Sequence, residues 1–178
     1  IYSCCDSDQL DIFNQGIASL EQIIPTCSIC RENIQRLTCN IICHTNQSDF
    51  SVAHVENGTN IVKELEVAIS YKFARGLFDS CKDVLFPNSN VRVISFICNL
   101  GGIKCDPRTF ITSLLSNSQF KIRPKIYDIN ETIPNQFTYA VDPKSHPCNE
   151  SYAAYTGVIR ECGCQDCFSS CLPPPVIP

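Results

Sequence analysis

Apolar residues recur at steps of three and four in two stretches near the start of the chain, which is the spacing of one face of a helix. The first stretch follows Asp6 and Ser7, either of which can cap a helix, and ends before Pro25; its apolar positions are Leu10, Phe13, Ile17, Leu20 and Ile24. The second runs from about residue 28 to 43, with an apolar stripe of Cys30, Ile34, Leu37 and Ile41. The pattern therefore predicts two consecutive amphipathic helices.

The longest helix is predicted after a polar surface loop over residues 44–60. It begins at a cap on Thr59 or Asn60, and its apolar positions are Val62, Leu65, Ile69, Phe73, Leu77 and Cys81. Gly76 lies inside this stretch and is unfavourable in a helix by about 1 kcal/mol relative to Ala.

Extended patterns dominate the second half of the chain. Residues 91–98 are rich in β-branched side chains, residues 120–126 alternate apolar and basic, and Phe137, Tyr139 and Val141 alternate with polar positions. A short helix from Asp106-Pro107 to residue 116 lies between the first two predicted strands. Helices thus come first and strands later, which indicates an α+β fold with a small sheet.

Cysteine content places the chain in an oxidising compartment. Fourteen of the 178 residues are Cys, a density at which disulfide bonds supplement the hydrophobic core. Four N-glycosylation sequons, at Asn46, Asn57, Asn130 and Asn149, agree with passage through the secretory pathway. We therefore expect a luminal or extracellular, disulfide-rich glycoprotein domain.

Composition and motifs exclude several classes of function. The net charge is −4 and no basic stripe exists, so nucleic acid is not an expected partner. The three His residues lie in predicted loops and no nucleophile motif is present, so no enzyme activity and no cofactor are expected. Cys27-x2-Cys30 and Cys164-x2-Cys167 have zinc-ligand spacing, but an oxidising compartment favours disulfides, and we predict no metal. Residues 1–171 are interpreted as a single domain, and the Pro-rich residues 172–178 as a linker towards a membrane span outside this chain.

A resemblance to a known family rests on motifs spread over nearly the whole chain. These are Cys4-Cys5-Asp6-x-x-Gln9-Leu10, Cys27-x2-Cys30, Cys39-x3-Cys43, Val62-Lys63-Glu64-Leu65, Cys81-Lys82-Asp83-Val84 and Cys162-Gly163-Cys164-Gln165-Asp166-Cys167-x3-Cys171. All fourteen cysteines find a counterpart in order. The chain resembles the N-terminal luminal domain of the Niemann-Pick type C membrane transporter family, which includes an intestinal-type paralogue.

The resemblance implies helices packed around a small mixed three-stranded sheet, with a deep pocket for cholesterol or a related sterol. It implies that the domain receives sterol from the soluble Niemann-Pick type C carrier, in the late endosome or lysosome or at the extracellular face of the plasma membrane, and passes it to the rest of a parent membrane protein. It also implies the disulfide pairs Cys5–Cys43, Cys27–Cys162, Cys30–Cys81, Cys98–Cys105, Cys148–Cys167 and Cys164–Cys171.

Two departures from the family concern the sterol pocket. The cysteines that match Cys4 and Cys39 pair in the family with an upstream segment that this chain lacks, so either that segment was lost or excised, or Cys4 and Cys39 pair with each other. The same segment supplies part of the family's pocket. Gly16 stands where relatives often carry Asn, which leaves more room and one fewer polar anchor.

The resemblance places the sterol site on the first helix and on the later helix and strand. Gln9 is the residue implied to bind the sterol hydroxyl, although the spacing Asp6-x-x-Gln9 alone favours a capping box. The expected wall consists of Phe13, Gly16, Leu114, Phe120 and Ile122, any of which could instead be ordinary core. Phe96 and Ile97 match an apolar pair that docks the soluble carrier, with strand core as the alternative. The competing function is a protein-interaction ectodomain with the same fold and a non-sterol or vestigial pocket.

Overall fold

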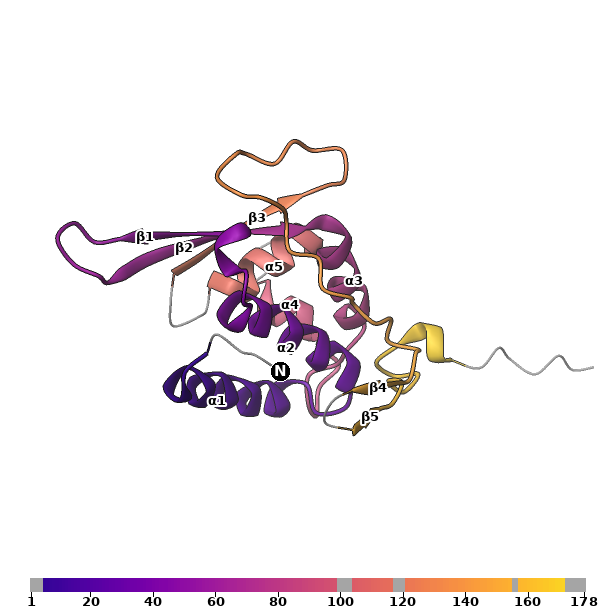
Figure 1. Ribbon diagram of the computed structural model, residues 1–178. Coiled ribbons are helices and arrows are strands. Elements are labelled where there is room, and N and C mark those ends of the chain that lie inside the picture. Colours follow the sequence, from indigo (N-terminus) through magenta and orange to yellow (C-terminus); the bar gives the residue numbers. More distant parts are fainter. Residues whose placement is uncertain (1–4, 99–103, 117–120, 155–156, 172–178) are drawn as a thin grey trace, which may run out of the picture.

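Helices form one layer of the molecule and a small sheet forms the other (Figure 1). The computed structural model describes residues 5–98, 104–116, 121–154 and 157–171. Within these ranges the helices are α1 (Ser7–Ile23), α2 (Ser28–Cys43), α3 (Tyr71–Cys81), α4 (Val93–Ile97) and α5 (Pro107–Ser116). The strands are β1 (Ser51–Val55), β2 (Val62–Ser70), β3 (Lys121–Tyr127), β4 (Tyr152–Ala154) and β5 (Gly157–Ile159). No helix among the described residues combines the length and the apolar character needed to cross a bilayer.

The sheet is mixed and three-stranded, as the resemblance implied. Its order is β1–β2–β3, with β2 antiparallel to β1 and parallel to β3. Because side chains alternate along a strand, Leu65, Val67 and Ile69 of β2 turn to the helices while Glu64 and Glu66 face outward. β4 and β5 pair separately as an antiparallel hairpin near the end of the chain.

The core lies between the sheet and helices α2, α3 and α5. Its largest fully buried side chains include Phe50, Phe73 and Phe110. Helix α5 packs against α3 and β3, and α2 packs against α3. This burial of aliphatic and aromatic surface, at about 25 cal/mol per Å² of apolar area removed from water, is the main stabilising contribution.

Four predicted elements are confirmed. Helices α1 and α2 and strand β3 lie where the apolar periodicity placed them, and α5 lies where its cap and first-position proline placed it. Helix α1 begins at Asp6, whose side chain accepts a hydrogen bond from the Gln9 amide, and α5 follows Asp106, whose carboxylate accepts from the Thr109 amide at 2.8 Å. Hydrogen bonds from the Thr109 and Arg108 amides, the Thr109 bond first, lower the pKa of Asp106.

The predicted long helix from residue 60 is wrong in its first half. Residues 62–70 form β2, the central strand, and the helix begins only at Tyr71. Ser70 caps it, since its hydroxyl accepts a 3.0 Å hydrogen bond from the Phe73 amide. Val62, Leu65 and Ile69 fit a helical stripe. The segment nevertheless forms a strand, because β1 on one side and β3 on the other supply hydrogen-bond partners for its backbone amides and carbonyls.

Three further expectations are corrected. Residues 93–97 form the short helix α4 rather than a strand, and only Arg92 makes a bridge, to Leu85. Residues 137–141 contribute a single bridge, between Val141 and Ile69, because only one or two residues of this segment reach β2 beyond the end of β1. Within the predicted 44–60 loop, residues 51–55 form β1, which pairs with β2. The β4–β5 hairpin was not predicted.

Six disulfide bonds join the described residues, and they are the six pairs that the resemblance implied. They are Cys5–Cys43, Cys27–Cys162, Cys30–Cys81, Cys98–Cys105, Cys148–Cys167 and Cys164–Cys171. Cys39 is exposed and forms no disulfide within the described ranges. Burial first, and then Glu32, raise the pKa of its thiol. Cys4 lies outside the described residues, so a Cys4–Cys39 bond stays a prediction.

Candidate functional site

Helix α1 carries an apolar face that the core covers only in part. Ile24, just after the helix, is fully buried, and Leu20 and Ile23 pack against the core. Phe13 and Ile17 are half-buried but lie outside the contiguous core, and Leu10 is 41% exposed. The helix is attached at both ends, by its C-terminal residues and by the Cys5–Cys43 bond to the end of α2. The middle of its apolar face is therefore available for further contacts.

Gln9 lies at the N-terminal end of this face and is exposed. Its side-chain oxygen accepts a 3.1 Å hydrogen bond from the Asp6 amide, and its own amide donates to the Asp6 carboxylate at 2.8 Å. These two bonds form a capping box, the alternative role that spacing alone favoured. The side-chain NH2 group of Gln9 takes no part in the capping box, so a ligand could accept from it while the cap persists.

The other expected wall residues lie on two parts of the fold. Phe13 and Gly16 follow Gln9 on the same side of α1, and a side chain at Gly16 would meet open space. Leu114 on α5 and Ile122 on β3 are half-buried and pack against the core. Phe120 lies outside the described residues. Helix α1 packs against α2, whereas α5 packs against α3 and β3, so the structure gathers the expected residues as two groups.

Two surface hollows are lined by described residues, and neither includes an expected sterol contact. One, of about 380 Å³, lies between the α1–α2 turn, residues 85–90 and the chain at Gln165 and Asp166. Its floor is polar, and the Asp166 carboxylate there accepts a 3.0 Å hydrogen bond from the Leu85 amide. The other, of about 160 Å³, lies beside Cys39 and His44.

The expected docking pair lies on α4. Phe96 is 62% exposed, and Ile97 is half-buried against the core. The ring of Phe96 lies 5.6 Å from that of Phe86, so the two aromatic side chains form an apolar surface beside the Cys98–Cys105 bond. The strand-core alternative does not describe Phe96, because its segment is a helix and its side chain faces outward.

An ion-pair network covers the outer face of the sheet, and sequence reasoning missed it. Glu64 pairs with Lys121 at 2.6 Å and with Arg123 at 3.0 Å, and Glu66 lies within 3.8 Å of Lys125. A hydrogen bond from Lys121 first, and then the charges of Arg123 and Lys121, lower the pKa of Glu64. The signal in the sequence was the alternation of acidic residues at Glu64 and Glu66, and of basic residues at Lys121, Arg123 and Lys125.

His54 completes a group of potential metal ligands in this network. Single ligand atoms of His54, Glu64 and Glu66 lie within 4.8 Å of one another. The two carboxylates are already neutralised by three basic side chains of β3, and a cation would have to displace these. We interpret the group as a surface ion-pair network.

The four sequon asparagines, Asn46, Asn57, Asn130 and Asn149, are all exposed. Asn57 lies at the turn of the β1–β2 hairpin, which projects from the body of the molecule (Figure 1). All four side chains are therefore accessible to modification, which the sequons predict.

Comparison with known proteins identifies one family and several relatives. The family described as Niemann-Pick C1 N terminus matches residues 1–178. The chain is 28% identical over 181 residues to the pig protein named NPC intracellular cholesterol transporter 1, a match that covers 97% of this chain. It is 31% identical over 114 residues, 54% of this chain, to homolog 1 of Caenorhabditis elegans, and 23% identical over 177 residues, 94% of this chain, to homolog 1b of Drosophila melanogaster.

The matched region is a small part of each relative. It spans 14% of the pig and fly proteins and 8% of the nematode protein. Its disulfide-rich structure accords with a luminal or extracellular location. With the whole length matched by one family and six disulfides in place, the chain belongs to the Niemann-Pick C1 N-terminal domain family.

Proposed function

We propose that this domain binds cholesterol or a related sterol and hands it on during sterol transport. The observation that carries the proposal is the apolar face of α1, where Phe13 and Ile17 lie outside the core. Gln9 stands at one end of that face as a hydrogen-bonding group. A rigid apolar ligand with one terminal hydroxyl matches this arrangement.

The free energies of apolar burial and of hydrogen bonding favour a sterol over a polar ligand. Burying roughly 400 Å² of rigid apolar surface contributes about 10 kcal/mol before the entropy cost of association. A single neutral hydrogen bond from Gln9 adds about 1 kcal/mol. Shape would therefore set affinity, and Gln9 would set the orientation of the bound sterol.

The proposed site comprises Gln9, Phe13 and Gly16 from α1, Leu114 from α5, and Phe120 and Ile122 at β3. The open space at Gly16 supports a preference for sterols different from that of relatives with Asn there. Sterol binding that brings the α1 residues together with those of α5 and β3 requires movement of α1, which is attached mainly through its ends.

Equilibrium binding of radiolabelled cholesterol to the purified, disulfide-intact chain tests the proposal. We expect saturable binding, competition by hydroxylated cholesterol and plant sterols, and about fivefold weaker binding or altered competition in Gln9→Ala. The matched control is Gln22→Ala, an exposed glutamine on the opposite side of α1. Absence of binding by every sterol would instead favour the protein-interaction ectodomain.

We infer that the partner is a soluble Niemann-Pick type C sterol carrier, and that it docks at α4. Support comes from Phe96, exposed beside Phe86. Phe96→Ser and Ile97→Ser should slow sterol transfer from the carrier at least tenfold without changing equilibrium binding. Phe168→Ser, which alters a similarly exposed ring on the C-terminal segment, should leave transfer unchanged.

The proposed setting is the lumen of the late endosome or lysosome, or the extracellular face of the plasma membrane. We further propose that residues 172–178 link the domain to a membrane-embedded remainder that accepts the sterol. The names of the pig, nematode and fly relatives, all cholesterol transporters or homologs of them, support this setting. Imaging of the full-length protein with this domain tagged would locate it directly.

A further inference from the structure

A segment near the end of the chain crosses the helices on its way to the β4–β5 hairpin (Figure 1). We call residues 143–152 the strap. Ser145 in the strap lies against Gly76 of α3, and His146 lies against α2. The Cys148–Cys167 bond ties the strap to the C-terminal segment, which the Cys27–Cys162 bond in turn ties to the start of α2.

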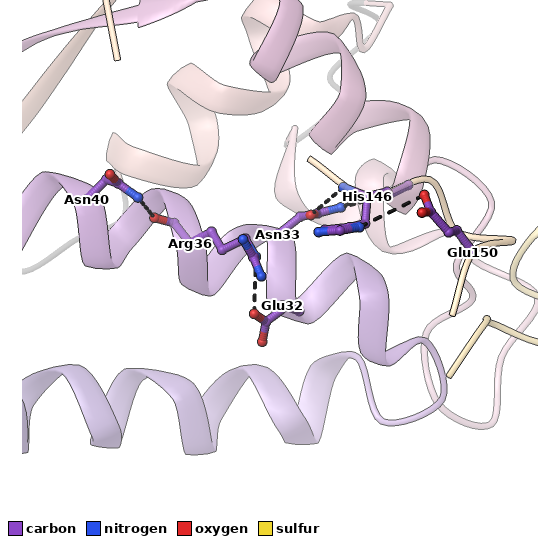
Figure 2. Close-up of polar contacts among 7 residues, drawn as sticks. Glu32, Asn33, Arg36, Asn40, His146 and Glu150 are labelled. Atoms are coloured by element: carbon purple, nitrogen blue, oxygen red, sulfur yellow. Dashed lines mark hydrogen bonds and ion pairs between the residues drawn. The ribbon is translucent and has the colours of Figure 1, made fainter. Parts of the chain in front are cut away.

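Asn33 holds the strap on α2 through its backbone. Its side-chain nitrogen donates to the His146 carbonyl at 2.8 Å and to the Ser80 hydroxyl at 2.9 Å, and its oxygen accepts from the His146 amide at 3.0 Å. Asn33 is fully buried. Figure 2 shows this pair of bonds between α2 and the strap.

The His146 imidazole is buried, and one of its two nitrogens has no hydrogen-bond partner among the described residues. The residue is 5% exposed, and its ring stacks on Tyr152 with centroids 3.6 Å apart and planes 6° apart. Its Nδ1 is buried and makes no hydrogen bond with the described residues. Glu150 Oε2 lies 3.9 Å from Nδ1, within reach of an ion pair but too far for a hydrogen bond (Figure 2).

Charged groups of both signs surround the imidazole. From α2 come Arg36 and Glu32, which are paired with each other at 3.2 Å, and the Arg36 guanidinium lies 5.4 Å from the Tyr152 ring. From the strap come Lys144, which is exposed, and Glu150. From α3 comes the uncharged Ser80 hydroxyl.

Burial and the surrounding charges together disfavour protonation of His146. Burial first, and then the positive charges of Arg36 and Lys144, lower the pKa of His146, while Glu150 and Glu32 act in the opposite direction with smaller effect. Burial likewise raises the pKa of the neighbouring Tyr152 hydroxyl. The closed strap therefore disfavours the protonated imidazole relative to a solvated histidine.

We propose that His146 makes the attachment of the strap to α2 sensitive to acid: protonation places a charge in this buried site, and the strap opens from α2. When the strap is open, the imidazole is solvated and takes up a proton near its ordinary pKa of 6.5. Below that pH the open form binds more protons than the closed form. The closing free energy is thus complete above about pH 6.5 and falls as the pH drops towards the lowered pKa.

The pH range in which the strap would open matches the pH of compartments along the secretory and endosomal route, where histidines commonly act as pH sensors. Opening breaks both backbone hydrogen bonds to Asn33 and separates the Tyr152 ring from the Arg36 guanidinium of α2, while the disulfide bonds keep the strap tethered. None of the strap residues named here belongs to the proposed sterol site.

Amide hydrogen exchange of the intact chain at pH 7.5 and pH 5.0, corrected for the intrinsic pH dependence of exchange, tests the proposal. We expect protection of strap residues 145–152 to fall at least threefold at pH 5.0 relative to protection of α5. His146→Phe keeps an aromatic ring in the stack without a titrating group and should abolish this response. His54→Gln removes an exposed histidine of the hairpin and should retain it.

NMR titration of the imidazole carbon protons gives a second readout, in which His146 should titrate below pH 6.5. Three results would each overturn the proposal: equal protection at both pH values, a response that survives in His146→Phe, or titration of His146 at or above pH 6.5. Should His146→Phe fail to fold, His146→Gln provides the non-titrating variant with the same expected outcome.

Discussion

Gly76 of α3 and Ser145 of the strap approach so closely that a Cβ on Gly76 would lie 2.9 Å from the Ser145 Cβ and would overlap its hydroxyl. The glycine that looked unfavourable inside a predicted helix is therefore the position over which the strap passes. Its cost in helix propensity, about 1 kcal/mol, is offset by the packing it permits.

Gly76→Ala should consequently destabilise the domain. Relief of the overlap requires movement of the strap or of Ser145, for which we expect a loss of about 1–3 kcal/mol in unfolding free energy despite the better helix former. Denaturant unfolding with the disulfides intact measures it. Gly16→Ala is the matched control, since it lies in a helix facing open space and should stabilise by up to about 1 kcal/mol. Ser145→Gly should largely restore the Gly76→Ala variant; failure of that rescue would contradict the packing argument.

Asn33→Ala should be among the most destabilising polar substitutions. It leaves the buried His146 amide and carbonyl without partners, at about 3 kcal/mol in unfolding free energy. Asn40→Ala on the same helix removes only a bond to the Arg36 carbonyl and should cost under about 0.5 kcal/mol. The two variants are compared by denaturant unfolding, and similar costs would show that the strap contact contributes little.

The roles of Gln9 in capping and in sterol binding can be separated by changing Asp6. Asp6→Ala removes the carboxylate that accepts from the Gln9 amide and should lower the unfolding free energy by about 1 kcal/mol. The backbone amide of residue 6 still donates to the Gln9 side-chain oxygen, so the Gln9 side chain keeps its place and sterol affinity should be unchanged, measured by radiolabelled sterol binding. A loss of binding as large as in Gln9→Ala would mean that the helix end, and not the Gln9 amide, matters to the ligand.

Glu64→Gln should reduce the acid sensitivity of folding. The folded-state pKa of Glu64 is lowered from its ordinary 4.5, chiefly by Lys121. Its contribution is therefore present above about pH 4.5 and is lost as the pH falls through the lowered value. Unfolding free energy should fall less steeply below pH 4.5 in the variant than in the parent. The difference should shrink in 1 M NaCl, where exposed ion pairs are screened; equal acid slopes at low salt would show that the network is not stabilising.

The six disulfides should contribute unequally. Cys27 and Cys162 are 135 residues apart and buried, whereas Cys98 and Cys105 are 7 apart. Loop-closure entropy then makes replacement of the long-range pair by Ala more costly by about 2.6 kcal/mol. Thermal unfolding of the two double variants gives the order, and a reversed order would indicate that the Cys98–Cys105 loop fixes α4 more strongly than its length implies.

Local periodicity was enough to predict the elements in which the spacing of apolar residues equals the repeat of the helix or strand that forms. Helices α1, α2 and α5 and strand β3 were predicted because caps, Pro25 and alternation act within a few residues. Cysteine order supplied the family, and through it the pairing and the mixed sheet. The acidic alternation at Glu64 and Glu66 would have indicated the ion-pair network only to a reader who already took residues 62–70 as a strand.

What the sequence by itself determined was therefore the family, the disulfide pairs that the family resemblance implied, and the elements stabilised by short-range contacts. Tertiary structure alone decided that residues 62–70 are the central strand, that α1 keeps a partly uncovered apolar face, and that His146 is buried against α2. The reason is physical: strand pairing, burial and the Asn33–His146 bonds join residues up to 113 positions apart, and their free energy depends on the packed partner rather than on any neighbouring residue.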